Sequence, residues 1–293
     1  MPLSNLPNIF RSITATWSVY RCIIQCVVGS VPALIGLPLA QAVTPGIQCP
    51  EVRTADGIEH IGIGQDCFSI QKFESAASSP NIKVLVVFMQ GNSHSSAALA
   101  VNRATASNLS RQLKASTIAV QRRDTSESDD AQDHDYTPGN VALMATALDR
   151  LRSLNAGKKI LLIGHSHGAV MAALVASRFP ASADAYLLAG CPCDLPQWLQ
   201  WRNTSTVKTV NGMHSLSPQD EVGKIKAGTR IALVVGNKDD NTLAKFSEAF
   251  VSSLQRQGVK TRLTYAIGAT HISVLRSPEF FMLAEGLTAD LSR

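Results

Sequence analysis

Apolar and polar residues follow each other in blocks of two kinds along most of this 293-residue chain. Short apolar runs bounded by turn-forming residues are typical of strands that are buried on both faces of a sheet. Such runs cover residues 82–88, 117–121, 159–164, 185–189, 230–235 and 261–267. The longer stretches between them carry apolar residues at helical spacing. This alternation predicts an α/β protein with a doubly wound, mainly parallel sheet and helices on both faces.

One helix is predicted clearly between the second and third runs. Thr137 and Pro138 provide the cap and first-turn residues that commonly begin a helix. The apolar positions that follow at helical spacing are Val141, Met144, Ala145, Leu148 and Leu151. Residues 43–80 read as opening strands of the same sheet, for which antiparallel pairing is one option. Because the sequence contains no internal repeat, we predict a single domain over residues 43–293, with a lid insertion at about 195–228.

The third run leads into the most informative motif of the chain. Gly164, Ser166 and Gly168 form a Gly-X-Ser-X-Gly pattern between this run and the helix-forming residues 169–179. A serine at such a junction sits on a tight strand-to-helix turn, and its hydroxyl projects above the sheet. The glycines leave room for neighbouring backbone, and the N-terminus of the helix stabilises developing negative charge. The pattern therefore predicts that Ser166 is a nucleophile.

Two candidate partners of this serine follow later strand runs. Asp239 comes just after the fifth run, and His271 just after the sixth. Because the carboxyl ends of parallel strands share one edge of the sheet, where ligands bind, we expect both to meet Ser166 there. His271 would act as the general base, and Asp239 would orient its imidazole. Asp240 is the alternative acid.

These three motifs resemble those of the α/β-hydrolase superfamily, and the resemblance covers the chain from about residue 82 to its end. The residues around Asp239 and Asp240 are most similar to the dienelactone-hydrolase and prolyl-oligopeptidase-like branch, in which the first aspartate of the pair belongs to the triad. The resemblance implies a serine hydrolase that needs no cofactor and cleaves a carboxylic ester. A peptidase or amidase is the alternative, although Ala169 stands where the peptidases usually have glycine.

A serine hydrolase also needs two backbone donors for the oxyanion of its tetrahedral intermediate. One is expected to be the N–H of His167, which follows the nucleophile. The other is expected in the turn after the first strand run, where Gln90, Gly91 and Asn92 replace the His-Gly-X turn that is common in the family. We expect Asn92 to supply this donor.

The substrate pocket is expected to include one residue near this turn and two from the insertion. His94 follows the oxyanion turn closely enough to line a pocket. Trp198 and Trp201 are three residues apart, a spacing at which a helix presents both side chains on one face. This aromatic face would either contact an acyl, aryl or sugar group or pack the lid onto the core.

The residues alone leave two other functions open, a zinc hydrolase and a binding protein without catalysis. His165 and His167 form a His-X-His pattern that zinc hydrolases also use, with His94 and His271 as further ligands. The residues after this pattern do not continue the usual metallo-β-lactamase motif, so we assign no metal. A hydrolase fold that serves only as a binding protein is the other reading, since a fold alone does not establish activity.

The first 42 residues read as an export signal. They contain Arg11 and Arg21 near the start and no acidic residue, and they continue into a mainly apolar stretch that closes with an Ala-X-Ala ending. These are the features of a signal peptide, here cleaved after Ala42, which predicts a periplasmic or secreted protein. The alternative is an uncleaved membrane anchor, which Pro32 and Pro38 disfavour.

Charge and cysteine content refine the choice of partners. The net charge of +5 falls to +3 without the signal, too little and too dispersed to indicate nucleic acid, so we expect a small ester or amide as the substrate. Four cysteines follow the signal, an even number that suits disulfides in an exported protein. We expect Cys49 to pair with Cys67. The state of Cys191 and Cys193 stays open between a local disulfide, free thiols and cross-pairing.

Overall fold

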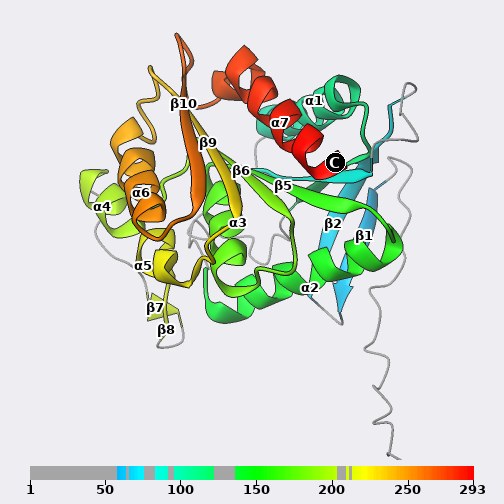
Figure 1. Cartoon of the computed structure of the whole chain (residues 1–293), viewed down its shortest axis with the longest axis horizontal. Helices are drawn as coiled ribbons and strands as arrows, with labels where there is room; N and C mark the ends of the chain where they lie inside the picture. The colour runs from blue at the N-terminus through cyan, green and yellow to red at the C-terminus, as the bar shows by residue number, and fades with distance from the viewer. Residues whose placement is uncertain are drawn as a thin grey trace, which may run out of the picture. The chain divides into compact units, whose positions relative to one another are not determined.

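An eight-stranded sheet forms the centre of the computed structural model, in the strand order β1-β2-β4-β3-β5-β6-β9-β10 (Figure 1). The structure describes residues 58–63, 66–75, 83–91, 96–121, 136–202, 209–210 and 213–293. The strands are β1 (Ile58–Ile63), β2 (Asp66–Phe73), β3 (Val84–Met89), β4 (Thr117–Gln121), β5 (Lys159–His165), β6 (Ala185–Ala189), β9 (Arg230–Gly236) and β10 (Lys260–Ala266). β2 is antiparallel to β1 and β4, and all the other pairs are parallel. The six predicted strands and the antiparallel opening are confirmed.

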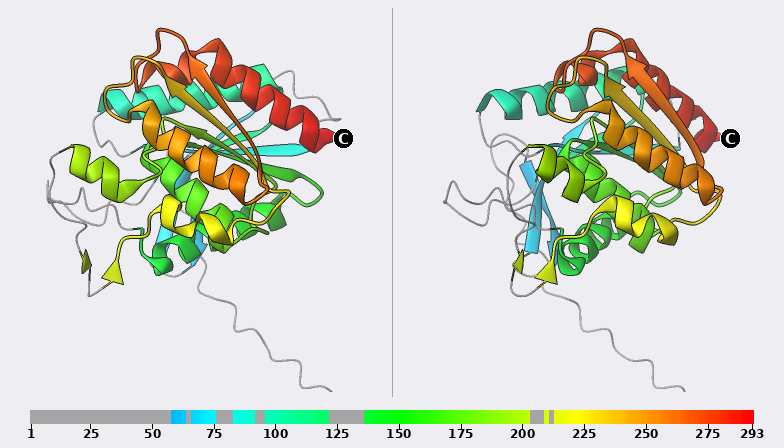
Figure 2. Two further views of the ribbon diagram at one scale, coloured as in Figure 1. Left: turned by 60° about the vertical axis from the view of Figure 1, so that its left-hand side comes forward. Right: turned by 90° about the vertical axis from the view of Figure 1, so that its left-hand side faces the viewer.

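Helices cover both faces of this sheet, as Figure 2 shows. Two of them, α1 (Ser96–Leu113) and α7 (Pro278–Ser292), bury apolar side chains against one face. Three others, α2 (Pro138–Leu154), α3 (His167–Arg178) and α6 (Ala244–Arg256), pack on the other face. Alternate residues of the central strands belong to the two cores, as expected for strands whose successive side chains point to opposite faces. The predicted doubly wound architecture is therefore confirmed.

The predicted helix after Thr137 is α2. Thr137 is its N-cap, and the Thr137 hydroxyl accepts a hydrogen bond from the N–H of Asn140 at 3.3 Å. Pro138 occupies the first turn, where its missing N–H costs nothing. The apolar positions predicted from the spacing are all buried. They pack α2 beside α3, whose residues 168–177 are buried throughout.

The segment predicted to be a lid insertion, residues 195–228, contains several short elements among its described residues. They are α4 (Leu195–Trp201), the paired strands β7 (Thr209–Val210) and β8 (Met213–His214), α5 (Pro218–Glu221) and the 3₁₀ turn η1 (Val222–Lys224). The carboxylate of Asp194 caps α4 by accepting the N–H of Gln197 at 3.2 Å. None of the described helices is long and apolar enough to cross a membrane.

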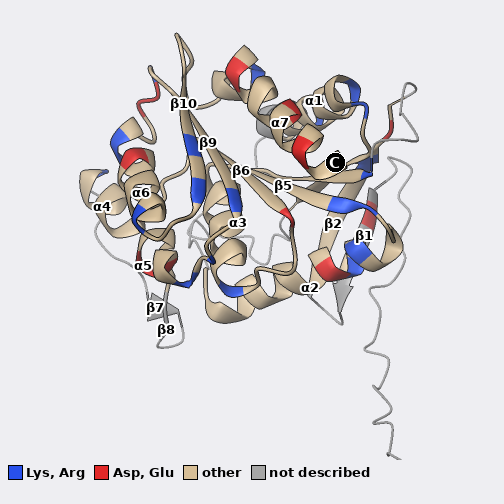
Figure 3. Ribbon diagram, viewed as in Figure 1, with Lys and Arg blue, Asp and Glu red and all other residues tan. Residues whose placement is uncertain are grey.

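Charged residues of both signs are interspersed on the outer helices and at the strand ends (Figure 3). Three parallel strands begin with an exposed cation, namely Lys159, Arg230 and Lys260. These cations lie at the N-terminal edge of the sheet, because they are the first residues of their strands. Ser166, Asp239 and His271 lie at the opposite edge, just after the C-terminal ends of β5, β9 and β10.

Candidate active site

Ser166 occupies the sharp turn between β5 and α3, with φ 54° and ψ −119°. A positive φ is uncommon for a residue with a side chain and marks a backbone conformation that its surroundings must hold in place. One restraint is visible directly, because the Ser166 N–H donates to the carbonyl of Ala189 in β6 at 2.9 Å. Within the described chain the Ser166 side chain makes no capping bond to α3, so its hydroxyl is not used to satisfy the helix.

Close backbone packing explains the glycines on both sides of Ser166. A Cβ atom on Gly164 would lie 2.3 Å from the carbonyl oxygen of Gly168, and one on Gly168 would lie 2.3 Å from that of Met89. The turn after β3 approaches the serine itself, because a Cβ on Gly91 would lie 2.9 Å from the Ser166 Cβ. The predicted need for glycine at positions 164 and 168 is confirmed, and Gly91 has the same requirement.

His271 and Asp239 form a buried hydrogen-bonded pair. His271 Nδ1 lies 2.9 Å from Asp239 Oδ2, and the two residues are only 7% and 6% exposed. Since an ionised carboxylate can only accept, the Nδ1–H of the neutral ring donates, which leaves Nε2 as the acceptor. This is the tautomer that a general base needs. Asp240, the alternative acid, is exposed instead.

The carboxylate of Asp239 is held by the turn that follows it. Its Oδ1 accepts the backbone N–H groups of Asn241 at 2.9 Å and Thr242 at 2.8 Å, and its Oδ2 lies 2.8 Å from the Thr242 hydroxyl. Burial alone would raise the pKa of the Asp239 carboxyl. The bond to His271, its charge and the donors of Thr242 outweigh burial, so the pKa lies below its ordinary value.

Thr242 was not among the predicted site residues. Its hydroxyl lies 3.1 Å from His271 Nδ1 and 3.1 Å from the carbonyl of Gly190, in addition to its contact with Asp239. The sequence did carry a signal, since an aspartate followed by donors two and three residues later is the pattern of an Asx turn. The threonine therefore joins the acid, the base and the end of β6.

Ser166 and the His271–Asp239 pair each contact one of two adjacent residues at the end of β6. Ala189 accepts the N–H of Ser166, and the next residue, Gly190, lies against the acid–base pair. A Cβ on Gly190 would be 3.1 Å from His271 Nδ1 and 3.3 Å from Asp239 Oδ2, and its φ of +52° also favours glycine. Ala189 and Gly190 therefore connect the nucleophile to the acid–base pair: the first bonds Ser166, and the second packs against the pair.

His165 supports His271 from the other side. The His165 side chain is buried, and its Nε2 lies 2.8 Å from the backbone carbonyl oxygen of His271. A carbonyl oxygen can only accept, so Nε2 carries the proton. The centroids of the two imidazole rings are 4.7 Å apart. Burial, and next the repulsion from His271, lower the pKa of His165 to about 3, so it stays neutral near neutral pH.

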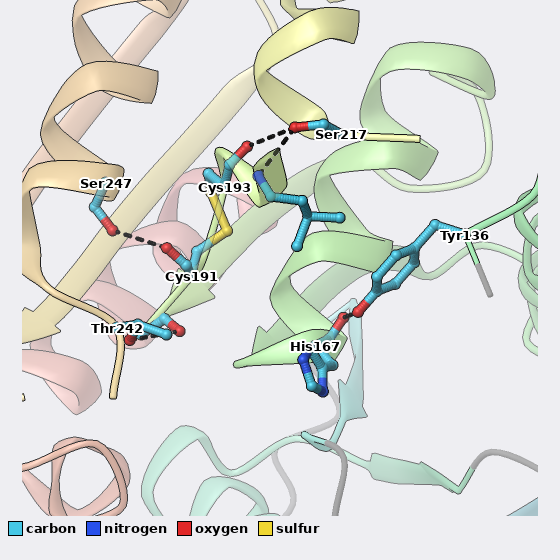
Figure 4. The surroundings of a disulfide bond; sticks show 9 residues. Tyr136, His167, Cys191, Cys193, Ser217, Thr242 and Ser247 are labelled. Carbon is cyan, nitrogen blue, oxygen red and sulfur yellow. Dashed lines mark hydrogen bonds between the residues drawn. A yellow bond between two sulfur atoms is a disulfide. The ribbon is translucent and has the colours of Figure 1, made fainter. Parts of the chain in front are cut away.

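His167 is the first residue of α3, so its N–H has no acceptor within the helix and faces the N-terminal end. Its carbonyl accepts the Tyr136 hydroxyl at 3.2 Å (Figure 4), and the two rings are 6.4 Å apart. The donor role expected for this N–H stays a prediction. The other predicted oxyanion donor, Asn92, and the predicted pocket residue His94 lie outside the described residues.

Trp198 and Trp201 have different environments, so they do not form the single aromatic face that their spacing predicted. Trp198 is 7% exposed and meets the His167 ring edge-on at 5.8 Å. Trp201 is 37% exposed and packs against Phe246 of α6 at 6.0 Å. Of the two roles expected from the sequence, packing of the insertion onto the core describes Trp198.

Cys191 and Cys193 form a disulfide directly after Gly190 (Figure 4). Both cysteines are buried, and the Ser217 and Ser247 hydroxyls each lie 3.5 Å from one of their carbonyl oxygens. Of the options left open by the sequence, the local disulfide is the one observed. The predicted Cys49–Cys67 pair lies outside the part of the chain whose side chains the structure describes.

The zinc reading required His165 and His167 to act together. In the structure, His165 donates to the carbonyl of His271, whereas the His167 ring makes aromatic contacts with Tyr136 and Trp198. Among the described residues there is no group of three or more His, Cys, Asp or Glu side chains placed to hold a metal ion. The two histidines therefore have separate structural partners.

Replacement of Gly168 by alanine is expected to disrupt the elbow, because the new methyl group would collide with backbone that cannot rotate away. We expect Gly168→Ala to lower the free energy of unfolding by about 3 kcal/mol, as measured by urea denaturation. Gly286→Ala is the control, since nothing lies within 4 Å of its added Cβ. Equal stability of the two variants would contradict the packing described here.

Stability in acid is expected to depend on His165. The folded pKa of His165, about 3, lies below the unfolded value of 6.5, so the unfolded chain binds the extra proton as the pH falls. This group therefore lowers stability progressively between pH 6.5 and 3, by at most about 1.4 kcal/mol per pH unit. His165→Gln removes the titration, and its melting temperature should fall less steeply than that of the wild type over this range. An equal decrease of the melting temperature with falling pH in both proteins would refute the lowered pKa of His165.

Comparisons with known proteins identify the family to which this fold belongs. The model of the alpha/beta hydrolase family matches residues 86–282. The proline iminopeptidase of Mycobacterium smegmatis is 13% identical with a TM-score of 0.59, over 80% of this chain and 98% of that one. An esterase of Pyrococcus furiosus is 14% identical with a TM-score of 0.60, over 84% and 100%. No curated protein matches. Identities this low show the fold alone, but the family model covers more than half of the chain, which therefore belongs to the alpha/beta hydrolase family.

Proposed function

We propose that this protein is a serine hydrolase that cleaves a carboxylic ester through an acyl-enzyme on Ser166. The observation that carries the proposal is the arrangement around the end of β6. A strained serine at a nucleophile elbow and a buried His271–Asp239 pair contact adjacent residues, Ala189 and Gly190. Family membership supports hydrolysis as the reaction class.

In the acylation step, His271 Nε2 removes the proton of the Ser166 hydroxyl as Oγ attacks the ester carbonyl carbon. The carbonyl oxygen becomes an oxyanion, which the N–H groups of His167 and Asn92 stabilise. Collapse of this intermediate breaks the ester bond, and the imidazolium returns its proton to the leaving alcohol. Ser166 then carries the acyl group.

Deacylation repeats these steps with water. His271 removes a proton from the water molecule as its oxygen attacks the acyl carbon. The second tetrahedral intermediate then collapses, its bond to Ser166 Oγ breaks, and the imidazolium returns the proton to this oxygen as the carboxylic acid leaves. Asp239 stays ionised throughout, because its depressed pKa keeps it charged at neutral pH. Its charge stabilises the imidazolium in both steps.

We further propose that the protein is exported. The support is the signal-like composition of residues 1–42, which lie outside the described residues. The Cys191–Cys193 disulfide is consistent with this proposal, because disulfides persist in oxidising compartments. Secretion of a full-length chain and N-terminal sequencing of the mature product test both export and cleavage after Ala42.

The serine mechanism is tested with a fluorophosphonate probe and p-nitrophenyl esters. We expect the wild type to be labelled, and Ser166→Ala to lose labelling and about 10⁶-fold in kcat, the cost typical for loss of a catalytic serine. Ser177→Ala is the matched control, since the hydroxyl of this buried α3 serine donates to the Leu174 carbonyl of its own helix. Labelling of Ser166→Ala at the wild-type rate would contradict the proposal.

The ester preference is tested separately with a panel of esters and Xaa-Pro amides under the same conditions. We expect a higher kcat/KM for the esters. Faster cleavage of the amides would favour the peptidase alternative. Absence of labelling and of turnover on both panels would favour a binding protein with a hydrolase fold.

A further inference from the structure

We propose that Trp198 of α4 is a positioning residue for Asp239, which it orients through the peptide group between Asn241 and Thr242. The inference rests on the proposed role of Asp239 as the aspartate of the catalytic triad. It assigns the insertion at 195–228 a part in holding the triad.

A chain of two hydrogen bonds carries the proposal. The indole Nε1–H of Trp198 donates to the Asn241 carbonyl oxygen at 2.8 Å. The N–H of Thr242 donates to Asp239 Oδ1, also at 2.8 Å. This carbonyl and this N–H belong to one peptide group, which is planar and rigid. A rotation of the peptide that breaks the first bond therefore also turns the second donor away from the carboxylate.

The two bonds also strengthen each other. A donor on the carbonyl oxygen withdraws electron density from the peptide and makes its N–H a better donor, an effect that is larger away from water. Asp239 and Trp198 are both buried, at 6% and 7% exposure. The indole therefore stabilises the charged form of Asp239 without touching it.

α4 holds Asn241 at a second point. The Arg202 side chain, just past the end of α4, donates to Asn241 Oδ1 at 2.8 Å, and its guanidinium lies 5.7 Å from the centre of the Trp198 ring. The Asn241 N–H in turn donates to Asp239 Oδ1. Asn241, which lies between the two peptide groups that donate to the carboxylate, is therefore held both at its backbone carbonyl by Trp198 and at its side chain by Arg202.

Trp198 links this acid loop to the nucleophile elbow. Its ring meets the ring of His167 edge-on, and the N–H of His167 is the proposed oxyanion donor. One side chain from the insertion therefore contacts the two parts of the site that must stay in register. This role differs from the substrate contact that was one expectation from the sequence, because Trp198 is buried and its indole N–H bonds the Asn241 carbonyl.

Trp198→Phe tests the proposal, because it keeps an aromatic side chain at this position and removes the indole N–H together with the smaller ring of the indole. We expect kcat for a p-nitrophenyl ester to fall about three- to tenfold, the effect of losing one neutral hydrogen bond, with KM changed less than about twofold. A second readout needs no substrate. The low-field proton resonance of the His271 Nδ1–H, which depends on its bond to Asp239, should shift or broaden.

Two further variants separate positioning from packing. Trp201→Phe removes an indole from the same helix and should leave the His271 proton resonance unchanged. Arg202→Met, at an exposed position that cannot unfold the core, should produce a smaller change in kcat and in this resonance in the same direction as Trp198→Phe. A lowered melting temperature of Trp198→Phe with unchanged kcat and resonance would show a packing role only and overturn the proposal.

The outcomes also separate this inference from the proposed function. A wild type that is labelled at Ser166 and a Trp198→Phe variant with unchanged kcat would refute only the positioning role. A wild type without labelling or turnover would refute the serine mechanism. The His271 resonance would then still decide whether Trp198 orients Asp239.

Discussion

The buried carboxylate of Asp239 is the constraint on which the geometry of the site depends. Burial of a carboxylate in a protein costs on the order of several kcal/mol of hydration free energy, unless donors of the protein replace the lost water molecules. Here the donors come from Asn241, Thr242 and His271. Since the first two follow in the same turn and the third comes from the loop after β10, satisfying this one charge fixes the turn after β9 and the imidazole together.

Strand order brings this pair to the same edge of the sheet as Ser166. β5, β6, β9 and β10 are consecutive neighbours in the sheet, so the loops at their carboxyl ends lie side by side. The elbow at Ser166 is strained, and it is held by the Ala189 carbonyl on one side and by the turn containing Gly91 on the other. The positive φ of Ser166 is therefore maintained by contacts with the ends of β6 and β3. These close contacts leave no room for a side chain at Gly91 or Gly168.

Sequence reasoning succeeded where the signal is local. Apolar runs identified the strands, and glycines around Ser166 identified the elbow, because burial and close backbone contact leave marks at the residue itself. It missed Gly190, Thr242 and the bond from His165 to the His271 carbonyl. These features arise from contacts between segments up to about a hundred residues apart in the chain, and one residue of such a pair does not reveal the other. The role of Trp198 was uncertain for the same reason.

The first helix of the insertion, α4, is connected to the site in two ways, through the chain from Gly190 and through the hydrogen bond of Trp198. Gly190 lies against Asp239 and His271, and the chain continues from it through the Cys191–Cys193 disulfide to Asp194, which caps α4. From α4 the indole of Trp198 donates to the Asn241 carbonyl, and the hydroxyl of the next residue, Thr242, returns the path to the Gly190 carbonyl. A closed path of covalent and hydrogen bonds resists displacement more than either contact alone, because moving α4 requires breaking two restraints at once. The segment that sequence reasoning treated as a lid is thus, at its first helix, part of the frame that holds the acid.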